Sequence, residues 1–504
     1  MFRNRRILFF IILLIAVSSR FFYLDKGYNS DEGWLLKTAG LDLNRLLPFL
    51  AEGRSVYPPL SPFLLHLWIK LNDSEVWVRS YFVFFGLALC ILVYIIGKAY
   101  LDKRFGLIAF FICAISPLLI WSSQFVRSYI DSAFWAILST YFMLRIVKGG
   151  NFWRNSLGYI FSGACALYSS YLNVLILISQ AVFILIFYFR DLKFLRRWVV
   201  LQALVIIIFL PCLPLMLKQL KLATAIDPKW GERGFQLLGL NLGYHARSII
   251  ATLGMDPGFL WTYPLAQRFN KYVLVAFAGL VFFIAGWFFT SALKNFRGCF
   301  KDNRITWFFV VISVSALLLY DILVETMNFP FQPEYFVTQH VLFIFVLSSV
   351  IYSMKRRKGF GIFTLAVISL IFILRFNEAV KPEFETKKAH TYLTKSLKAT
   401  DCLLMVRNTN LYIDPKAFNV VTLYEYFHKD SDADYYKPLN EEARAALNGI
   451  KARYETVWFY RLHGNDEILG ANRLIMDWLR SNGYEVEGIQ KFRRIDVVRY
   501  ERID

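Results

Sequence analysis

Apolar runs of roughly 18–22 residues recur along most of this chain of 504 residues, and they constrain its fold more than any other feature. A helical run of this length matches the hydrocarbon core of a bilayer. Inside lipid, every backbone N–H and C=O must be paired within the protein, so such runs form helices. The sequence therefore predicts a polytopic α-helical membrane protein with about eleven spans, at residues 7–24, 77–97, 105–125, 128–147, 156–172, 173–189, 198–217, 272–290, 305–325, 336–353 and 359–376.

The basic residues lie in alternate loops between these runs, and they set the predicted orientation. The formal net charge is +20, and clusters such as "KRRK" at 355–358 fall in every second loop. Membrane proteins concentrate Lys and Arg on the cytoplasmic side. We therefore expect a cytoplasmic N-terminus and do not interpret the charge as a sign of nucleic-acid binding. We interpret the first run as an uncleaved membrane helix, because no small-x-small cleavage site precedes "SSRFFYLDKGY".

Three segments outside the predicted spans are long. Residues 25–76 form the first outer loop, whose apolar stretches "LNRLLPFL" and "YPPLSPFLLHLWIKL" predict short helices in the membrane interface. Residues 218–271 form a second outer loop. The chain divides into a membrane domain, 1–376, and a soluble tail, 377–504. In the tail, "DCLLMVRN" and "TVWFYRL" are typical of buried strands, "DEILGANRLIMDWLRSNG" is helix-periodic up to Gly483, and "YEVEGIQKFRRIDVVRYER" alternates like a hairpin. These stretches predict a small α/β domain on the outer side.

Two adjacent acids, Asp31 and Glu32, follow the first span in "YNSDEGW". One interpretation is structural: Asn29 or Ser30 caps an interfacial helix, and acids in its first turn complement the helix dipole. The other is a general base, since partial desolvation raises the pKa of a carboxylate toward the range that suits proton abstraction. The pattern alone leaves both interpretations open.

Arg127 and Asp131 are four residues apart at the outer end of the fourth span. They can form a structural ion pair along one helix face. Alternatively, the guanidinium of Arg127 can bind an anion, and at this depth the obvious anion is a lipid phosphate. Tyr57 begins "YPPL", in which Pro58 and Pro59 make a rigid turn into an apolar helix.

Two further motifs carry polar residues on the outer side. "YHARS" contains Arg247 in the second outer loop, and "FQPEYFVTQH" places Glu334 and Tyr335 before the tenth span. None of the six cysteines forms a C-x-x-C pair, so the sequence indicates neither a disulfide framework nor a zinc site.

Together these motifs resemble one family of membrane enzymes. "SDE" at 30–32, "YPPL" at 57–60, "RSY" at 127–129 and "PEYF" at 333–336 occur in this order, with a long interfacial first loop and a soluble C-terminal domain. The layout is similar to that of the GT-C glycosyltransferases, specifically the protein O-mannosyltransferases and the aminoarabinose (lipid A) transferases. The resemblance covers the whole membrane region, and each motif is short.

The resemblance implies a reaction and a set of roles. Members of the family move a sugar from a polyprenyl-phosphate carrier to an acceptor hydroxyl at the outer face, by inverting displacement. Asp31 matches the family's catalytic Asp and would act as the general base, with Glu32 beside it. The interfacial helices would hold the prenyl chain, and the bacterial relatives imply a cytoplasmic membrane. The residues expected to contact the lipid phosphate and the donor are Arg127, Tyr57, Tyr129, Arg247 and Tyr335.

The sequence departs from the family at three positions. Many bacterial relatives have His or Lys where this chain has Tyr57, and some relatives have an acid that supports a metal where it has Val56. We therefore predict no metal site and no cofactor, although a divalent cation is compatible with the family. Glu334 stands where relatives often carry Arg, which alters the expected lipid-phosphate site.

Two other classes of function remain open at this stage. One is a transporter or flippase for a lipid-linked glycan, although such proteins usually place polar residues near the middle of their spans. The other is a non-catalytic membrane scaffold. The sequence does not identify the sugar or the acceptor.

Overall fold

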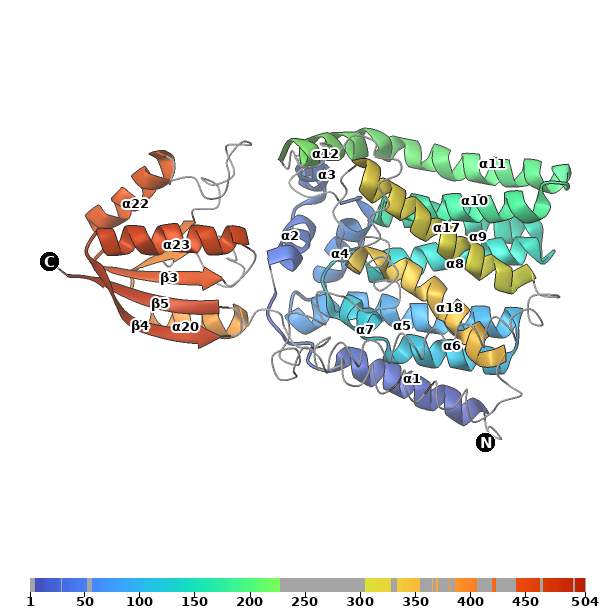
Figure 1. Ribbon diagram of the computed structural model, residues 1–504, viewed down its shortest axis with the longest axis horizontal. Coiled ribbons are helices and arrows are strands. Elements are labelled where there is room, and N and C mark those ends of the chain that lie inside the picture. Colours follow the sequence, from blue (N-terminus) through green and yellow to red (C-terminus); the bar gives the residue numbers. More distant parts are fainter. Residues whose placement is uncertain are drawn as a thin grey trace, which may run out of the picture.

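The computed structural model has a bundle of helices at one end and a small α/β unit at the other (Figure 1). It describes residues 5–28, 30–51, 57–226, 304–327, 333–353, 365, 369, 380, 386–405, 419–422, 441–462, 466–492 and 495–503. The predicted span 272–290, nearly all of the predicted span 359–376 and most of the second outer loop, with Arg247, lie outside these residues.

The helices of the bundle run side by side along the long axis of the molecule (Figure 1). The N-terminus lies at the end of the bundle away from the α/β unit. These helices follow the predicted apolar runs: α1 (Arg5–Phe21), α5 (Glu75–Tyr100), α6 (Lys103–Ile115), α7 (Pro117–Gln124), α8 (Ile130–Val147), α9 (Phe152–Ser169), α10 (Asn173–Tyr188), α11 (Leu192–Phe209), η1 (Leu210–Cys212), α12 (Leu213–Ile226), α17 (Arg304–Met327) and α18 (Val337–Ser353).

Fewer of the described helices are long and apolar enough to span a membrane than the eleven that the sequence predicts. In the part of the chain that the structure describes, three helices are long and apolar enough to cross a membrane: Glu75–Tyr100, Ile130–Val147 and Leu192–Lys221. Helices α6 and α7 make a fourth if they are taken together as one bent span. The number of spans therefore stays a prediction.

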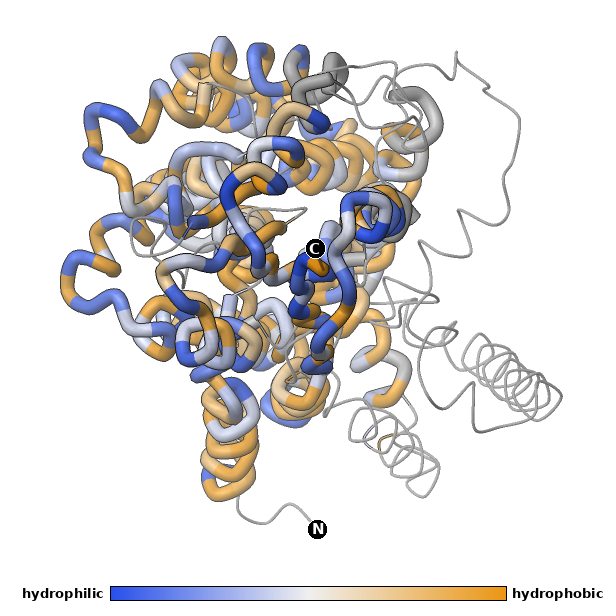
Figure 2. Tube along the Cα trace, turned by 90° about the vertical axis from the view of Figure 1, so that its left-hand side faces the viewer, coloured by the Kyte–Doolittle hydropathy of each residue, from blue (hydrophilic) through white to orange (hydrophobic). Residues whose placement is uncertain are grey.

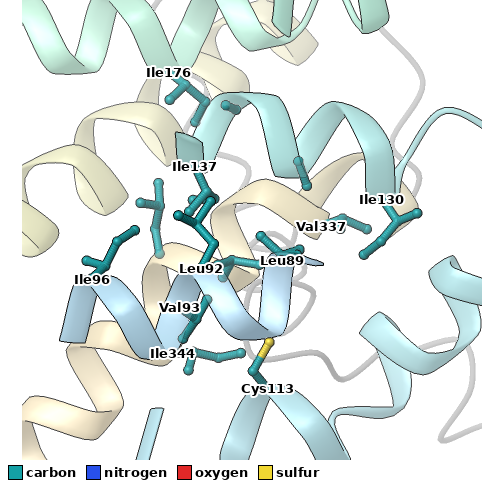
Figure 3. Packing of buried hydrophobic residues seen from close by; sticks show 14 of the residues in the cluster. Leu89, Leu92, Val93, Ile96, Cys113, Ile130, Ile137, Ile176, Val337 and Ile344 are labelled. Carbon is teal, nitrogen blue, oxygen red and sulfur yellow. The ribbon is translucent and has the colours of Figure 1, made fainter. Parts of the chain in front are cut away.

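Apolar side chains cover the outside of the bundle as well as its interior. Figure 2 shows hydrophobic residues along α1, which leads from the N-terminus, and Ile7, Phe10 and Leu14 are all exposed. Inside the bundle, residues from α5, α6, α8, α10 and α18 interlock, among them Leu89, Ile137 and Ile344 (Figure 3). A helix surface that is apolar all round is typical of a protein whose surroundings are lipid.

The predicted interfacial helices of the first outer loop are present as α2 (Ser30–Ala39), α3 (Leu43–Ala51) and α4 (Leu60–Ile69). They lie at the end of the bundle that faces the α/β unit (Figure 1). Pro59 is the N-cap of α4, with φ of −78°. Proline is favoured where a helix begins because its φ is already helical and it has no N–H to leave unpaired. The "YPPL" turn therefore starts α4, as predicted.

The run predicted as one straight span at 105–125 is instead two helices, α6 and α7, bent by 58°. Pro117 causes the break, since it has no N–H to donate to the carbonyl of Cys113. The fully buried Arg20 of α1 replaces the missing donors: its Nη2 donates to the carbonyl of Cys113 (3.2 Å) and its Nη1 to that of Ala114 (3.1 Å). The bend directs α7 toward the site described below.

The described residues of the C-terminal unit form a five-stranded sheet of order β2-β1-β3-β5-β4 with helices on both faces. Strands β1, β2 and β3 are parallel, whereas β5 is antiparallel to both β3 and β4. Side chains alternate: Leu404 and Phe459 pack against α22 and α23, and Leu403 and Trp458 pack toward α20. The elements are α20 (Thr386–Ser396), β1 (Cys402–Met405), β2 (Asn419–Thr422), α22 (Glu441–Arg453), β3 (Thr456–Leu462), α23 (Asp466–Ser481), β4 (Tyr484–Phe492) and β5 (Ile495–Arg502).

Several local predictions for the tail are confirmed. "TVWFYRL" is β3, and the alternating "YEVEGIQKFRRIDVVRYER" forms the β4–β5 hairpin. Helix α23 ends just before Gly483, whose φ of +82° suits glycine at the C-terminus of a helix. Strand β2 and helices α20 and α22 were not predicted.

Candidate functional site

The acidic pair lies at the start of α2, and one of its two side chains is held by specific partners. Glu32 is buried, and both of its carboxylate oxygens accept from Nη2 of Arg79, at 3.0 and 3.1 Å. The Oε1 atom also accepts from the backbone N–H of Val126 at 3.0 Å. Asp31 belongs to α2, but its side chain lies outside the described residues. Of the two expected cap residues, Asn29 is also outside them, and Ser30 is the first residue of α2, with its side chain outside them.

The contact with Val126 brings α2 to the loop between α7 and α8, which carries Arg127. The guanidinium of Arg127 stacks over the ring of Tyr57, with its central carbon 4.9 Å from the ring centroid. A cation over an aromatic face is attracted by the quadrupole of the ring. Two of the predicted donor-binding residues, 70 positions apart in sequence, are therefore in contact.

Asp131 does not form the ion pair with Arg127 that was one alternative from the sequence. It is fully buried at the start of α8, and its Oδ2 accepts from the hydroxyl of Ser61 at 2.5 Å. Ser61 belongs to the first turn of α4, directly after "YPPL". This hydrogen bond joins the "YPPL" turn to the Arg127 loop, so it fixes Tyr57 close to Arg127.

The fourth motif, "PEYF", reaches the same loop from η2 (Pro333–Phe336). The ring of Tyr335 meets that of Tyr129 edge to face, with centroids 6.3 Å apart. The charges of Arg127 and Glu334 both act on the Tyr129 phenol: the cation favours its ionised form and the carboxylate opposes it. Arg127, Tyr129 and Glu334 therefore share one electrostatic environment.

An apolar groove of about 720 Å³ adjoins Tyr57. It lies between α3, the start of α4 and the η1–α12 segment. Tyr57 packs against Leu46, Leu50 and Leu215 at its side. Gln219 of α12 holds this side together by donating from Nε2 to the carbonyls of Leu50 and Tyr57, each at 3.0 Å. The groove is lined by Leu43, Leu46, Leu47, Ala51, Pro59, Leu60, Phe63, Tyr168, Pro211, Cys212, Pro214, Leu215 and Lys218.

The structure thus brings together most of the residues that the sequence singled out. Glu32, Tyr57, Arg127, Tyr129 and Tyr335 all lie around the loop between α7 and α8. Arg247 lies outside the described residues, so its predicted role is not tested. Within the described ranges there is no group of three His, Cys, Asp or Glu side chains that could hold a metal ion.

Sequence reasoning missed the polar residues that hold this arrangement, above all Arg79 and the Ser61 partner of Asp131. Arg79 had a detectable signal: it is an ionisable residue within the first turns of an apolar run. Such residues are rare in membrane helices and usually have a specific partner or function. Ser61 carries no comparable signal, because serine is common at the start of any helix.

Comparison with known proteins supports the resemblance seen in the sequence. Residues 56–215 match the family described as dolichyl-phosphate-mannose-protein mannosyltransferase. No curated protein matches the chain by sequence.

Solved structures extend the likeness to the whole chain. ArnT from Cupriavidus metallidurans in the apo state aligns over 98% of this chain and 97% of its own, with 12% identity and a TM-score of 0.56. ArnT bound to undecaprenyl phosphate aligns over the same shares, with 11% identity and a TM-score of 0.53. The Archaeoglobus fulgidus oligosaccharyltransferase aligns over 90% of this chain and 67% of its own, with 15% identity and a TM-score of 0.52. The resemblance seen in the sequence is thereby confirmed: this chain is a membrane protein of the GT-C fold, and its residues 56–215 match the protein mannosyltransferase family.

Proposed function

We propose that this protein is an integral membrane glycosyltransferase that moves a sugar from a polyprenyl-phosphate carrier to an acceptor hydroxyl at the outer face of the membrane. The observation that carries the proposal is an apolar groove connected through one tyrosine to an arginine, whose loop is bonded to a helix with two acids. The groove adjoins Tyr57, Tyr57 lies under Arg127, and the loop of Arg127 is bonded to α2. These are the parts that a lipid-linked sugar donor requires.

The groove suits the prenyl chain of the donor. Its lining is almost entirely aliphatic and aromatic carbon, with Lys218 as the charged member. ArnT of the same fold has been solved with undecaprenyl phosphate bound, which supports a polyprenyl-phosphate ligand for this chain.

Arg127 is the best-placed group to bind the phosphate of the donor. Its charge cannot be lost, and the planar fork of its N–H donors matches phosphate oxygens. Tyr57 stacks on the guanidinium, and Tyr129, whose ring contacts that of Tyr335, is two residues further along the same loop. As the sugar–phosphate bond breaks, the negative charge on the departing polyprenyl phosphate grows, and a fixed cation stabilises this charge. We keep Arg247 as a further candidate for the same phosphate.

Asp31 is the proposed general base. It would take the proton of the acceptor hydroxyl while the oxygen attacks the anomeric carbon and the lipid phosphate leaves with the bonding electron pair. Direct displacement inverts the anomeric configuration and forms no covalent enzyme intermediate. Glu32, predicted as the second member of the catalytic pair, faces Arg79 with its carboxylate. We therefore expect Glu32 to act on the position of α2, an idea developed in the next subsection.

Release of polyprenyl phosphate from purified protein tests the proposal. The protein is placed in nanodiscs with a panel of polyprenyl-phosphate sugars and a cell-envelope extract as the acceptor source. We expect release by the wild type and by Asp42→Asn, in which an exposed acid of the same loop is changed. Asp31→Asn should lose release. No release from any donor would overturn the proposal in favour of a scaffold or transporter, and release that persists in Asp31→Asn would overturn the role of Asp31.

A further inference from the structure

One fully buried cation lies at the base of the site and has no place in the reaction proposed above. Arg79 is in the second turn of α5 and has no exposed surface. Its guanidinium carries five N–H donors in a rigid fork. Its hydrogen-bond acceptors are backbone carbonyls and one carboxylate. All of them belong to the segments that precede or contain Asp31 or directly precede Arg127.

The first group of acceptors precedes Asp31 along the chain. Arg79 Nη1 donates to the carbonyl of Lys26 (2.5 Å) and more weakly to that of Leu24 (3.5 Å), while Nη2 donates to that of Gly27 (3.2 Å). The guanidinium also stacks on the ring of Tyr28, 4.6 Å from its centroid. Arg79 therefore binds the backbone on the N-terminal side of α2, the helix that contains Asp31.

The second group of acceptors connects α2 with the Arg127 loop. Arg79 Nη2 binds the carboxylate of Glu32, which directly follows Asp31. Arg79 Nε donates to the carbonyl of Gln124 at 3.0 Å, and Glu32 accepts from the N–H of Val126 at 3.0 Å. Both contacts fall within three residues of Arg127. The proposed base and the proposed phosphate-binding residue are thus linked through one buried ion pair.

We propose that Arg79 and Glu32 form a positioning clamp that sets the distance between Asp31 and Arg127 for transfer. The inference rests on the proposed function and deepens it. Neither side chain is placed to contact substrate, because both are buried and Arg79 is surrounded by backbone carbonyls. Reactions of this kind depend on geometry: a misplacement of about 1 Å by a change away from the reacting atoms can cost about 100-fold in rate.

The clamp requires arginine in particular. A lysine at this position offers three donors at a single point and cannot reach carbonyls on two segments and a carboxylate at once. Arg79→Lys keeps the charge opposite Glu32 but loses the fork. Arg79→Met with Glu32→Met removes both charges together, so neither charge is left buried without its partner. The carbonyls of Lys26, Gly27 and Gln124 lose their donor in this variant. The two variants therefore separate the charge of the pair from the geometry of the fork.

Hydrogen exchange tests the clamp without any donor or acceptor. In nanodiscs, Arg79→Lys should speed amide exchange in α2 (residues 30–39) and at Val126 at least tenfold. Arg20→Lys is the matched control, because Arg20 is equally buried but bonds to α1, α6, α7 and Cys90 of α5, with no bond to α2. It should leave exchange in α2 unchanged. If amide exchange in α2 of the Arg79→Lys variant is as slow as in the wild type, the clamp is overturned.

Kinetics then separate positioning from simple loss of folded protein. Active protein is counted by its stoichiometry of undecaprenyl phosphate binding, and turnover is expressed per binding site. We expect kcat per binding site of the double methionine variant to fall at least tenfold, with KM for the donor changed by less than threefold. A double variant that recovers both stability and kcat would overturn the proposal, since Arg79 would then be only structural. A wild type that transfers from no donor would contradict the proposed function, while the exchange experiment would still decide the clamp.

Discussion

A buried lysine beside the clamp makes the stability of the protein depend on pH. Lys26 lies between α1 and α2, and its Nζ donates to Oε1 of Gln124 (3.0 Å) and to the carbonyl of Val380 (3.2 Å). Its pKa is lowered from 10.5 to about 7, chiefly because burial disfavours the charged amine; Arg79 lowers the pKa further and Glu32 partly opposes the shift. The folded state therefore holds this proton less tightly than the unfolded state does.

The sign and size of the effect follow from these values. Between pH 7 and 10.5 the unfolded chain binds more protons at Lys26 than the folded protein, so the free energy of unfolding rises with pH over this window. The slope in the middle of the window is about 1.4 kcal/mol per pH unit, and the whole difference is about 5 kcal/mol. Below pH 7 both states are protonated, and the contribution of Lys26 becomes constant.

Equilibrium denaturation in mixed micelles from pH 7.5 to 9.5 measures this slope. Wild type should gain stability across the range, and Lys26→Met should lose most of the gain because no titrating group remains in the buried position. Lys37→Met, which removes an exposed lysine of α2, should behave as wild type. An equally steep slope in Lys26→Met, or a flat wild-type profile, would show that the reasoning from burial is wrong.

Three further changes have defined outcomes. Gly86→Ala should destabilise the bundle by about 1–3 kcal/mol, because its Cβ would lie 2.1 Å from Oγ of Ser123, and the thermal unfolding midpoint measures this. Burial lowers the pKa of His390 from 6.5 to about 4, so the free energy of unfolding of the α/β unit should fall as the pH decreases from 6.5 to 4. His390→Phe should make this free energy less dependent on pH over the same range, which denaturation at several pH values measures. Leu215→Trp should fill the groove and weaken binding of undecaprenyl phosphate at least tenfold, whereas Leu217→Trp, on an exposed face of the same helix, should not.

Much of the local structure follows from the sequence. The apolar runs, the "YPPL" helix start, the β4–β5 hairpin and the end of α23 before Gly483 all depend on neighbouring residues. Periodicity, proline and glycine act over a few positions, so their effect can be predicted without knowing the rest of the fold. The order of the four motifs also indicated the fold. All four fall on the outer side of the predicted membrane domain, in the order found in the GT-C family.

The candidate site was predicted in its parts but not in its connections. Sequence spacing suggested that Arg127 pairs with Asp131, yet Asp131 bonds to Ser61 and Arg127 stacks on Tyr57. Residues four apart face each other only on a continuous helix. Here α8 begins at Ile130, so Arg127 precedes the helix and points elsewhere.

The sequence by itself determined that this chain forms apolar helices with an interfacial first loop, because in lipid each backbone must satisfy its own hydrogen bonds. Tertiary structure alone decided which polar groups meet. Arg79 binds Glu32 from 47 positions away, and Arg20 reaches carbonyls at a helix break 93 positions away. Membrane helices present similar apolar surfaces to one another, so packing and a few interhelical hydrogen bonds choose their neighbours. Which helices become neighbours therefore depends on the packing of the whole bundle and cannot be inferred from any single segment of the sequence.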